Sequence, residues 1–380
     1  MKARALLQAL YRAALEAVEP GRRTQDALSE TALRRARGRA RRIGVFAAGK
    51  AAATMARGAL AELGRCETLV VLPRGHPSSR LPREAVAFAS HPEPDASSMR
   101  AARRALRFFE SFGEEDLIVC LMSGGASSLL AHPRPGVTLA DKTRAVRALV
   151  RAGASILAVN RLRASLSAVK GGRLGRVTRA RLVTLVLSDV PGDRAAAVGS
   201  GPTLRGRRGD LVRVIGSNAD GLEAAAREAR RRGLAAVVEA HRLSGEARRA
   251  GRRLAARARG LRPGSVLLAG GETTVALGRS RGRGGRCLEL ALGAAEILDG
   301  ERRTALLAAG SDGRDGSSGA AGAFADGTTI SRAGHQGLDP DAAFARHDTR
   351  RLFWRLGNLF VTGPTGTNVG DWVFLIKSRS

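Results

Sequence analysis

The chain has 380 residues, 44% of them hydrophobic, and a formal net charge of +30. This length predicts two domains with sizeable cores, and no run reaches the ~18 uncharged apolar residues that a membrane span needs. The six histidines lack zinc-site spacing and the three cysteines, Cys66, Cys120 and Cys287, form no CxxC pair, so we expect no protein-held zinc, no disulfide framework and a cytoplasmic location.

The positive charge has two interpretations. A basic surface can bind the phosphates of nucleic acids, or the arginines can lie scattered on solvated helix faces. Aromatic residues make up only 3% of the chain, which leaves few platforms for base stacking. We favour scattered arginines and expect no nucleic-acid partner, although the charge would attract anionic substrates.

The predicted elements begin with an amphipathic helix that carries Leu6, Leu7, Leu10 and Leu15 on one face and ends at Pro20-Gly21. Beyond it, short apolar runs alternate with Ala-rich helical stretches, a pattern typical of α/β layers. The expected strands are 43–47, 68–72, 117–122, 182–187, 212–215, 266–269, 304–308 and 359–362. Their near-continuous apolar character favours strands covered on both faces, as in a parallel sheet.

The stretch 223–264 is rich in Ala and Arg, and we predict that most of it is helical, with a domain boundary near Pro263-Gly264. Gly-rich turns follow several expected strands, for example at 48–50, 123–125 and 270–272. Ligands of open α/β sheets bind at the carboxyl ends of the strands. The ligand site is therefore expected at these turns.

Lysine is rare in this chain, which has 59 arginines and five lysines. Lys50 and Lys170 both stand beside glycine in apolar or Gly-rich surroundings. Residues 44–50 fit the GxxxxGK pattern, but Ala51 follows where a P-loop needs Ser or Thr to bind Mg²⁺. We therefore reject a P-loop and predict that Lys50 opens a helix whose N-terminus favours an anion. The alternative is a surface lysine at a helix start.

Other turns carry polar groups. The backbone of the small-residue turn at 123–128 can cradle phosphate or carboxylate oxygens. Asp189 and Asp193 follow a strand, where they could hold Mg²⁺ or accept a proton from a substrate hydroxyl, or alternatively form an Asx turn or a helix cap. The stretches 270–286, 311–327 and 362–368 combine glycine with Asp, Glu, Thr or Asn, as ligand-binding loops do.

Together these motifs resemble the class II glycerate kinase family, the glycerate 2-kinases whose C-terminal part is called the MOFRL domain. The matching stretches run in family order from about residue 45 to residue 371. The most specific are LSDVPGD with GSGPT, at 187–203, and TGPTGTN, at 362–368.

The resemblance implies a Rossmann-like parallel-sheet domain at residues 1–262, a smaller α/β MOFRL-type domain at 263–380, and an active site in the cleft between them. It also implies transfer of the γ-phosphoryl group of ATP, with Mg²⁺, to the 2-hydroxyl of D-glycerate. The family's catalytic lysine matches Lys50, and its catalytic arginine matches Arg286. The oligomeric state, monomer or homodimer, stays open.

Asp189 is our third catalytic candidate, either as a Mg²⁺ ligand or as the proton acceptor, and Asp193 is a further candidate Mg²⁺ ligand. The candidate substrate- and nucleotide-binding residues are Ser123, Gly124, Gly125, Ser127, Asn160, Arg163, Lys170, Glu272, Thr273, Asp312, Thr365 and Asn368.

Three departures from the family pattern bear on substrate preference and turnover. Cys287-Leu288 stand where the family has Asn-Gln, Ala164-Ser165 replace Lys-His, and the chain is shorter between residues 203 and 216. Two other functions compete with the kinase. One is a hydroxypyruvate reductase, whose dinucleotide site would need GxGxxG where this chain has AAGKAAA; the other is a non-enzymatic nucleic-acid binder.

Overall fold

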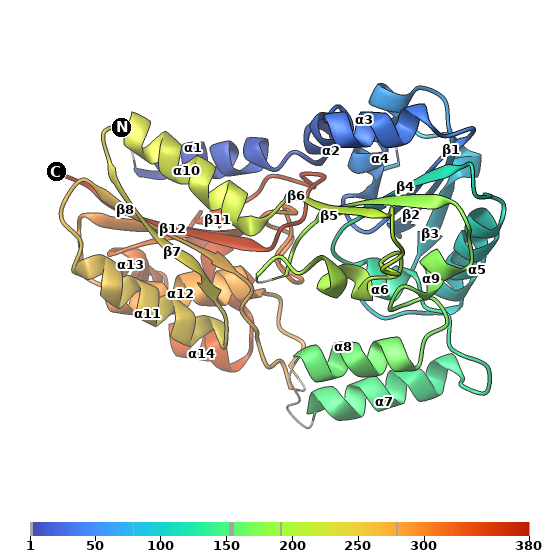
Figure 1. Cartoon of the computed structure of the whole chain (residues 1–380). Helices are drawn as coiled ribbons and strands as arrows, with labels where there is room; N and C mark the ends of the chain where they lie inside the picture. The colour runs from blue at the N-terminus through green and yellow to red at the C-terminus, as the bar shows by residue number, and fades with distance from the viewer. Residues whose placement is uncertain (1–2, 79, 152–155, 191, 279, 380) are drawn as a thin grey trace. The chain divides into compact units, whose positions relative to one another are not determined.

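The computed structural model describes residues 3–78, 80–151, 156–190, 192–278 and 280–379. The chain forms two compact units, each built around its own sheet (Figure 1). Residues 19–216 form the parallel-sheet unit, and residues 1–18 together with 217–380 form the mixed-sheet unit. This division differs from the boundary expected between residues 262 and 263.

The parallel-sheet unit is an α/β layer structure. Its strands are β1 (Ile43–Ala48), β2 (Glu67–Pro73), β3 (Val86–Ala89), β4 (Leu117–Met122), β5 (Arg181–Leu187) and β6 (Leu211–Gly216). Its helices are α2 (Pro20–Leu28), α3 (Thr31–Gly38), α4 (Ala52–Leu63), α5 (Ala96–Glu110), α6 (Ala126–Leu129), α7 (Leu139–Arg151), α8 (Ile156–Ser165) and α9 (Arg173–Arg176), with 3₁₀ turns η1 (Arg83–Ala85) and η2 (Ala195–Ser200).

All neighbouring strands of this sheet run parallel, in the order β3-β2-β1-β4-β5-β6. This is the strand order of Rossmann-type sheets. Strand β4 is buried along its whole length, and β1 from Gly44 onward. Helix α5 buries Ala101, Ala105 and Phe109 in the core of one face, where Phe109 meets Phe46 of β1 edge to face. The continuous apolar strands thus have the double burial that their sequences predict.

The mixed-sheet unit has strands β7 (Ala235–Leu243), β8 (Ser265–Gly271), β9 (Thr304–Gly310), β10 (Gly322–Asp326), β11 (Leu359–Phe360) and β12 (Asp371–Lys377), in the order β11-β10-β9-β12-β8-β7. Its helices are α1 (Ala3–Ala17), α10 (Asn218–Arg231), α11 (Ala247–Arg259), α12 (Arg286–Leu298), α13 (Thr329–His335), α14 (Pro340–Ala345) and α15 (Thr349–Arg355). Strands β7 and β8 run parallel, whereas the other neighbouring pairs run antiparallel.

The mixed-sheet unit departs from the sequence predictions at two points. The stretch 223–264, predicted as mostly helical, contains the end of α10 and all of α11, but also β7, because pairing with β8 overrides the helix preference of its alanines. A parallel sheet is wrong here, since β12 inserts antiparallel between β8 and β9. Strand β7, on the N-terminal side of Pro263-Gly264, belongs to the same sheet as the strands that follow.

The N-terminal helix α1 packs in the mixed-sheet unit. It buries Leu6, Leu7 and Leu10 as predicted, whereas Leu15 stays partly exposed. The Tyr11 hydroxyl donates to the carbonyl of Gly310 (2.8 Å), at the end of β9, and its ring packs edge to face on Trp372 of β12. These contacts explain why the first residues join the C-terminal part of the chain. Of the helices in the described ranges, none combines the length and apolar character needed to cross a membrane.

Candidate active site

The candidate site begins where the strand order of the parallel sheet reverses. Strands β1 and β4 are adjacent and parallel, and Ala48 is in register with Met122, so the turns that follow these strands lie side by side. From β1 the chain proceeds to β2 and β3 on one side of the sheet and returns through β4 on the other. Ligands of open α/β sheets bind in the crevice at such a reversal.

The two turns are tied together by hydrogen bonds. The Lys50 amide donates to the Gly124 carbonyl (2.9 Å), and the Ala51 amide donates to Ser123 Oγ (3.1 Å). Gly49, at φ +129°, must be glycine because a Cβ there would lie 2.2 Å from Ser123 Oγ. The Lys50 stem lies against Gly125, since a Cβ on Gly125 would be 3.4 Å from Lys50 Cγ. Helix α4 begins at Ala52, two residues after Lys50.

A cavity of about 640 Å³ adjoins these turns. It brings together four of the predicted binding residues, Gly125, Ser127, Arg163 and Lys170. It is lined by His91, Pro92, Glu93, Pro94, Gly125, Ser127, Ser128, Ala131, Lys142, Thr143, Val146, Arg147, Arg163 and Lys170. The helix pair α7 and α8 therefore forms one wall, and the turn after β4 forms another.

Lys170 is almost completely buried in this cavity. Only 3% of the residue is exposed, and its ammonium donates to Ser127 Oγ (2.5 Å), which in turn lies 3.3 Å from Ser200 Oγ. Burial, together with the charges of Lys142 and Arg163, holds the pKa of Lys170 well below its ordinary value. The glycines after Lys170 allow close docking on the 200–204 loop, since a Cβ on Gly172 would lie 2.5 Å from the Leu204 carbonyl oxygen.

Lys142, near the start of α7, was missed by the sequence predictions. It is 4% exposed and lines the same cavity. Burial and the nearby Arg163 charge lower its pKa from 10.5 to about 8. The rarity of lysine was the signal that could have found it, because it is one of only five lysines in the chain.

The cavity therefore concentrates positive charge away from solvent. Burial lowers the pKa of the Arg163 guanidinium as well. Among the described lining residues the acidic side chain is Glu93, and it is paired with Arg147 (2.6 Å). Buried cations that repel one another are costly unless a negative charge joins them. The arrangement suits an anionic ligand.

The predicted metal ligands lie on the loop after β5, the strand next to β4. Asp189 and Asp193 are both partly exposed, and the Asp193 amide donates to the Val190 carbonyl (3.0 Å), which folds the loop back on itself. Within the described part of the chain, no three His, Cys, Asp or Glu side chains are grouped to hold a metal. Two carboxylates still fit Mg²⁺, which commonly takes one or two carboxylates with substrate phosphates and water. The side chain of Asn160 lies outside the described residues.

In the mixed-sheet unit, the candidate residues gather at one edge of the sheet. Asp371 begins β12 and is in register with Gly271 and Gly310, so the start of β12 lies beside the ends of β8 and β9. Glu272 follows β8 and Asp312 follows β9. The antiparallel insertion of β12 thus brings three carboxylates to this edge.

Arg286, the first residue of α12, is held by these carboxylates. Its Nε donates to Asp371 Oδ2 (2.5 Å) and its Nη2 to Oδ1 (3.0 Å), while Nη1 pairs with Glu272. Asp371 is 2% exposed, and these negative charges raise the pKa of Arg286 against the opposing effect of burial. The fork is therefore fixed in orientation. Asp371 was not predicted, although its place directly after TGPTGTNVG was a usable signal.

A further carboxylate, that of Asp315, fixes the start of α12. The carboxylate of Asp315 accepts from the amides of Cys287 (3.0 Å) and Leu288 (2.9 Å). Asp315 is buried, and burial raises its pKa from 3.8 to about 7. A buried carboxylate thus anchors the turn that carries Arg286.

The remaining predicted residues lie at the same edge of the mixed sheet. Thr365 Oγ1 donates to the Ser311 carbonyl (2.5 Å), and its amide donates to the Asp312 carbonyl (3.4 Å). Thr273 and Asn368 are buried. Lys50 and Arg286 belong to different units, so their joint action on one substrate stays a prediction.

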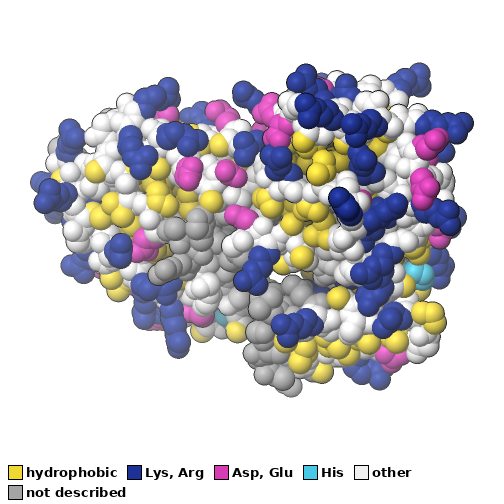
Figure 2. All heavy atoms as spheres, viewed as in Figure 1, with side chains coloured by type: hydrophobic (Ala, Val, Ile, Leu, Met, Phe, Trp, Pro, Cys, Tyr) yellow, Lys and Arg dark blue, Asp and Glu magenta, His cyan; other side chains and the backbone are white. Residues whose placement is uncertain are grey.

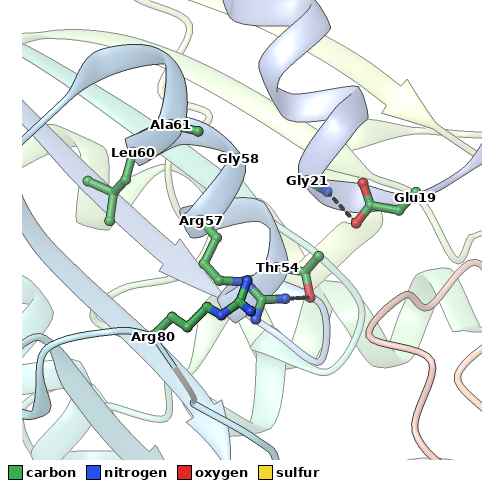
Figure 3. A pocket seen from close by; sticks show the side chains of 8 residues that line it. All are labelled: Glu19, Gly21, Thr54, Arg57, Gly58, Leu60, Ala61 and Arg80. Carbon is green, nitrogen blue, oxygen red and sulfur yellow. Dashed lines mark hydrogen bonds between the residues drawn. The ribbon is translucent and has the colours of Figure 1, made fainter.

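A second cavity, of about 580 Å³, lies beside α2 and α4 of the parallel-sheet unit (Figure 3). Arg57 and Arg80 line it, but Arg57 donates to Thr54 Oγ1 (3.4 Å), and Glu19 caps α2 by accepting from the Gly21 amide (3.1 Å). None of the predicted site residues lines this cavity. It is not the candidate site.

On the face of the molecule that Figure 2 shows, the remaining charge is dispersed. Figure 2 shows Lys and Arg side chains scattered over the visible face of both units, with Asp and Glu among them. This distribution agrees with the interpretation of the +30 charge as arginine on solvated faces.

Comparison with known proteins identifies the family. Residues 6–217 match a family described as a domain of unknown function, DUF4147, and residues 265–371 match the MOFRL family. A D-glycerate 2-kinase of Thermotoga maritima is 34% identical over 407 aligned residues, which cover 96% of this chain and 96% of the relative. The chain belongs to the class II glycerate kinase family.

A solved structure and a second relative are also similar to this chain. A crystal structure of a glycerate kinase from Thermotoga maritima superposes with a TM-score of 0.85 at 33% identity, covering 98% of this chain and 99% of that one. A protein of Agrobacterium vitis that carries the name hydroxypyruvate reductase is 39% identical over 377 residues, covering 86% of this chain and 97% of the relative.

Two of the three departures from the glycerate kinase pattern have local structural solutions. In the short segment between residues 203 and 216, the buried Arg205 side chain pairs with Asp210 (2.8 Å) and donates to the carbonyls of Gly175, Thr178 and Ala180. At 287–288, the Cys and Leu side chains are buried, and the two amides donate to the carboxylate of Asp315.

Proposed function

We propose that this protein is an ATP-dependent glycerate 2-kinase, which transfers the γ-phosphoryl group of ATP to the 2-hydroxyl of D-glycerate and releases 2-phosphoglycerate and ADP. Membership of the glycerate kinase family supports this proposal. The observation that carries it is the buried cationic cavity beside the β1/β4 turns, because both substrates and both products are anions.

Lys50 and Arg286 are proposed to neutralise the transferring phosphoryl group. Phosphoryl transfer depends on positioning and charge neutralisation more than on covalent chemistry. Lys50 offers a compact charge on a flexible stem, whereas Arg286 offers a planar fork. Asp371 and Glu272 hold that fork in one orientation, so we assign them a positioning role.

Asp189 is proposed to accept the proton of the 2-hydroxyl or, with Asp193, to hold Mg²⁺. A Mg²⁺ ion would supply charge neutralisation on the phosphate oxygens. The two roles of Asp189 differ in what they require: a base must reach the hydroxyl proton, whereas a metal ligand must reach the ion.

A kinase assay tests the proposal. Purified protein is incubated with ATP, Mg²⁺ and D-glycerate, ADP release is coupled to NADH oxidation, and the position of the product phosphate is read by ³¹P NMR. We expect 2-phosphoglycerate. A 3-phosphate product would contradict the assigned regiochemistry, and absence of turnover would contradict the kinase.

A second arm tests the name carried by the Agrobacterium vitis relative. The protein is incubated with hydroxypyruvate and NADH or NADPH without ATP. We expect no cofactor oxidation, since the turn after β1 reads AGKAAA and lacks the glycine pattern of a dinucleotide site. Robust oxidation would replace the kinase with the reductase.

A further inference from the structure

Lys142 is a buried charge that nothing in its described surroundings satisfies. Its Nζ is shielded from solvent and has no hydrogen-bond partner among the described residues, and Lys142 is 4% exposed. It lies near the start of α7, where its side chain lines the cavity. An unpaired buried ammonium costs several kcal/mol or loses its proton.

The nearby acidic groups are engaged elsewhere. Asp141, the preceding residue, accepts from the Thr138 amide (3.2 Å) and hydroxyl (2.5 Å) and pairs with Arg144 (3.4 Å). Glu93, which also lines the cavity, pairs with Arg147. These carboxylates do not explain why a lysine is buried at position 142.

The other groups around Lys142 are basic. Arg163 comes from α8, Lys170 from the 166–174 segment, and His132 from the loop before α7. The Nδ1 atom of His132 is also buried and has no partner in the described part of the chain, and burial with the charges of Arg103 and Lys142 lowers the pKa of this histidine. The remaining titratable groups near the cavity are His91, Glu93, Asp141, Arg144 and Arg147.

We propose that Lys142 binds an anionic oxygen, of a carboxylate or a phosphate, on the ligand that occupies this cavity. With Arg163 and Lys170 it forms a cationic site for an anionic ligand. The inference concerns the cavity of the proposed kinase and rests on that function only for the identity of the ligand, D-glycerate or the phosphates of ATP.

The choice of lysine has a physical reason. An arginine keeps its charge in an empty cavity, whereas a buried lysine can release its proton and relieve the repulsion. With a pKa of about 8, Lys142 can lose its proton near neutral pH and regain it when an anion binds. Three of the chain's five lysines, Lys50, Lys142 and Lys170, lie in or beside this cavity.

Calorimetry on Lys142→Met tests the site directly. D-glycerate, ADP and inorganic phosphate are titrated separately into the wild type, Lys142→Met and a control, Lys377→Met, which removes a lysine of the mixed-sheet unit. We expect Lys142→Met to bind at least one of these anions about tenfold or more weakly, the loss of one charge-assisted hydrogen bond, and Lys377→Met to bind all three like the wild type. If only the binding of D-glycerate is weakened, the anionic oxygen that Lys142 binds belongs to a carboxylate. If the binding of ADP or inorganic phosphate is weakened, it belongs to a phosphate.

A second readout separates binding from a structural role. At pH 8.5, titrations in buffers of different ionisation enthalpy count the protons taken up on binding. The wild type should take up a larger fraction of a proton than Lys142→Met or, if that variant does not fold, than Lys142→Gln. Unchanged affinities and equal proton uptake in wild type and variant would overturn the inference.

These measurements need no turnover. Anion binding that depends on Lys142 in a protein without kinase activity would uphold this inference and overturn the proposed function. Full kinase activity with unchanged substrate affinities in Lys142→Met would do the reverse.

Discussion

The two units place the cations of their candidate sites in opposite electrostatic settings. In the parallel-sheet unit, Lys142, Arg163 and Lys170 line one cavity whose acidic lining residue, Glu93, is already paired. In the mixed-sheet unit, Arg286 is held by two carboxylates, Asp371 and Glu272. Cations that repel one another gain most from an incoming anion, whereas a cation fixed by carboxylates is oriented before the ligand arrives.

This contrast suggests a division of labour. The repelling set is suited to binding, because ligand charge removes a cost that the empty site bears. The paired arginine is suited to acting on a transition state, because an oriented fork needs no reorganisation when charge develops. Substitutions in the first set should therefore alter ligand affinity, and substitutions in the second should alter turnover.

The largest effect is expected from the two catalytic candidates. Lys50→Ala and Arg286→Ala should each lower kcat by on the order of 10³-fold or more, by analogy with the loss of an arginine finger. Steady-state assays would measure kcat, and circular dichroism would show that each variant is folded. Arg286→Lys is the matched control: it keeps the charge without the fork and should recover only part of the rate. Near-wild-type turnover in both alanine variants would refute the assignment.

The second largest effect on turnover is expected from Asp371→Asn. The amide cannot pair with both Nε and Nη2 of Arg286, so the fork loses its orientation, and misplacement of this kind costs about 10²-fold. We expect kcat to fall while KM for ATP and D-glycerate changes little. A rise in KM with unchanged kcat would mean that Asp371 serves ligand binding instead.

The pH dependence of stability should distinguish Lys142. Its pKa of about 8 in the folded chain lies below the ordinary 10.5, so the unfolded state binds more protons between these values. The free energy of unfolding of the wild type should therefore rise with pH across this window, relative to Lys142→Met, by up to about 3 kcal/mol. Below pH 8 the variant should be the more stable protein. Urea titrations at pH 7 and pH 9.5 would measure both differences, and parallel curves would contradict the assigned burial.

The strands of the parallel sheet were predictable because a strand that is buried on both faces has a continuous run of apolar residues in its sequence. Strand β4 was predicted at its observed bounds, and β1 ended within one residue of its prediction. Strand β7 was missed, because its alanines favour a helix locally and only its pairing with β8 makes it a strand. The division into a Rossmann-like domain and a MOFRL-type domain was predicted from the glycerate kinase motifs.

The candidate residues were predictable to different degrees. Lys50, Lys170 and Arg286 lie in recognisable motifs. Lys142 and Asp371 do not, because the role of each depends on contacts between residues distant in sequence. Lys142 lines a cavity whose other lining residues come from positions between 91 and 170. Asp371 contacts Arg286 because β12 inserts antiparallel into the sheet. Such roles arise from tertiary packing, which local patterns do not encode.

The smallest effect is expected at the rim of the same cavity. Arg147 lines it, but its side chain is 57% exposed and pairs with Glu93, whose side chain is 68% exposed. Exposed ion pairs contribute about 0–1 kcal/mol and are screened by salt. Arg147→Ala should therefore change the free energy of unfolding by less than about 1 kcal/mol and weaken anion binding less than Lys142→Met does. Calorimetry at low and high ionic strength would compare the two variants, and the loss caused by Arg147→Ala should shrink with salt. If Arg147→Ala instead weakened binding as much as Lys142→Met, the rim rather than the buried lysine would hold the ligand, and the contrast between the two units would reduce to surface charge.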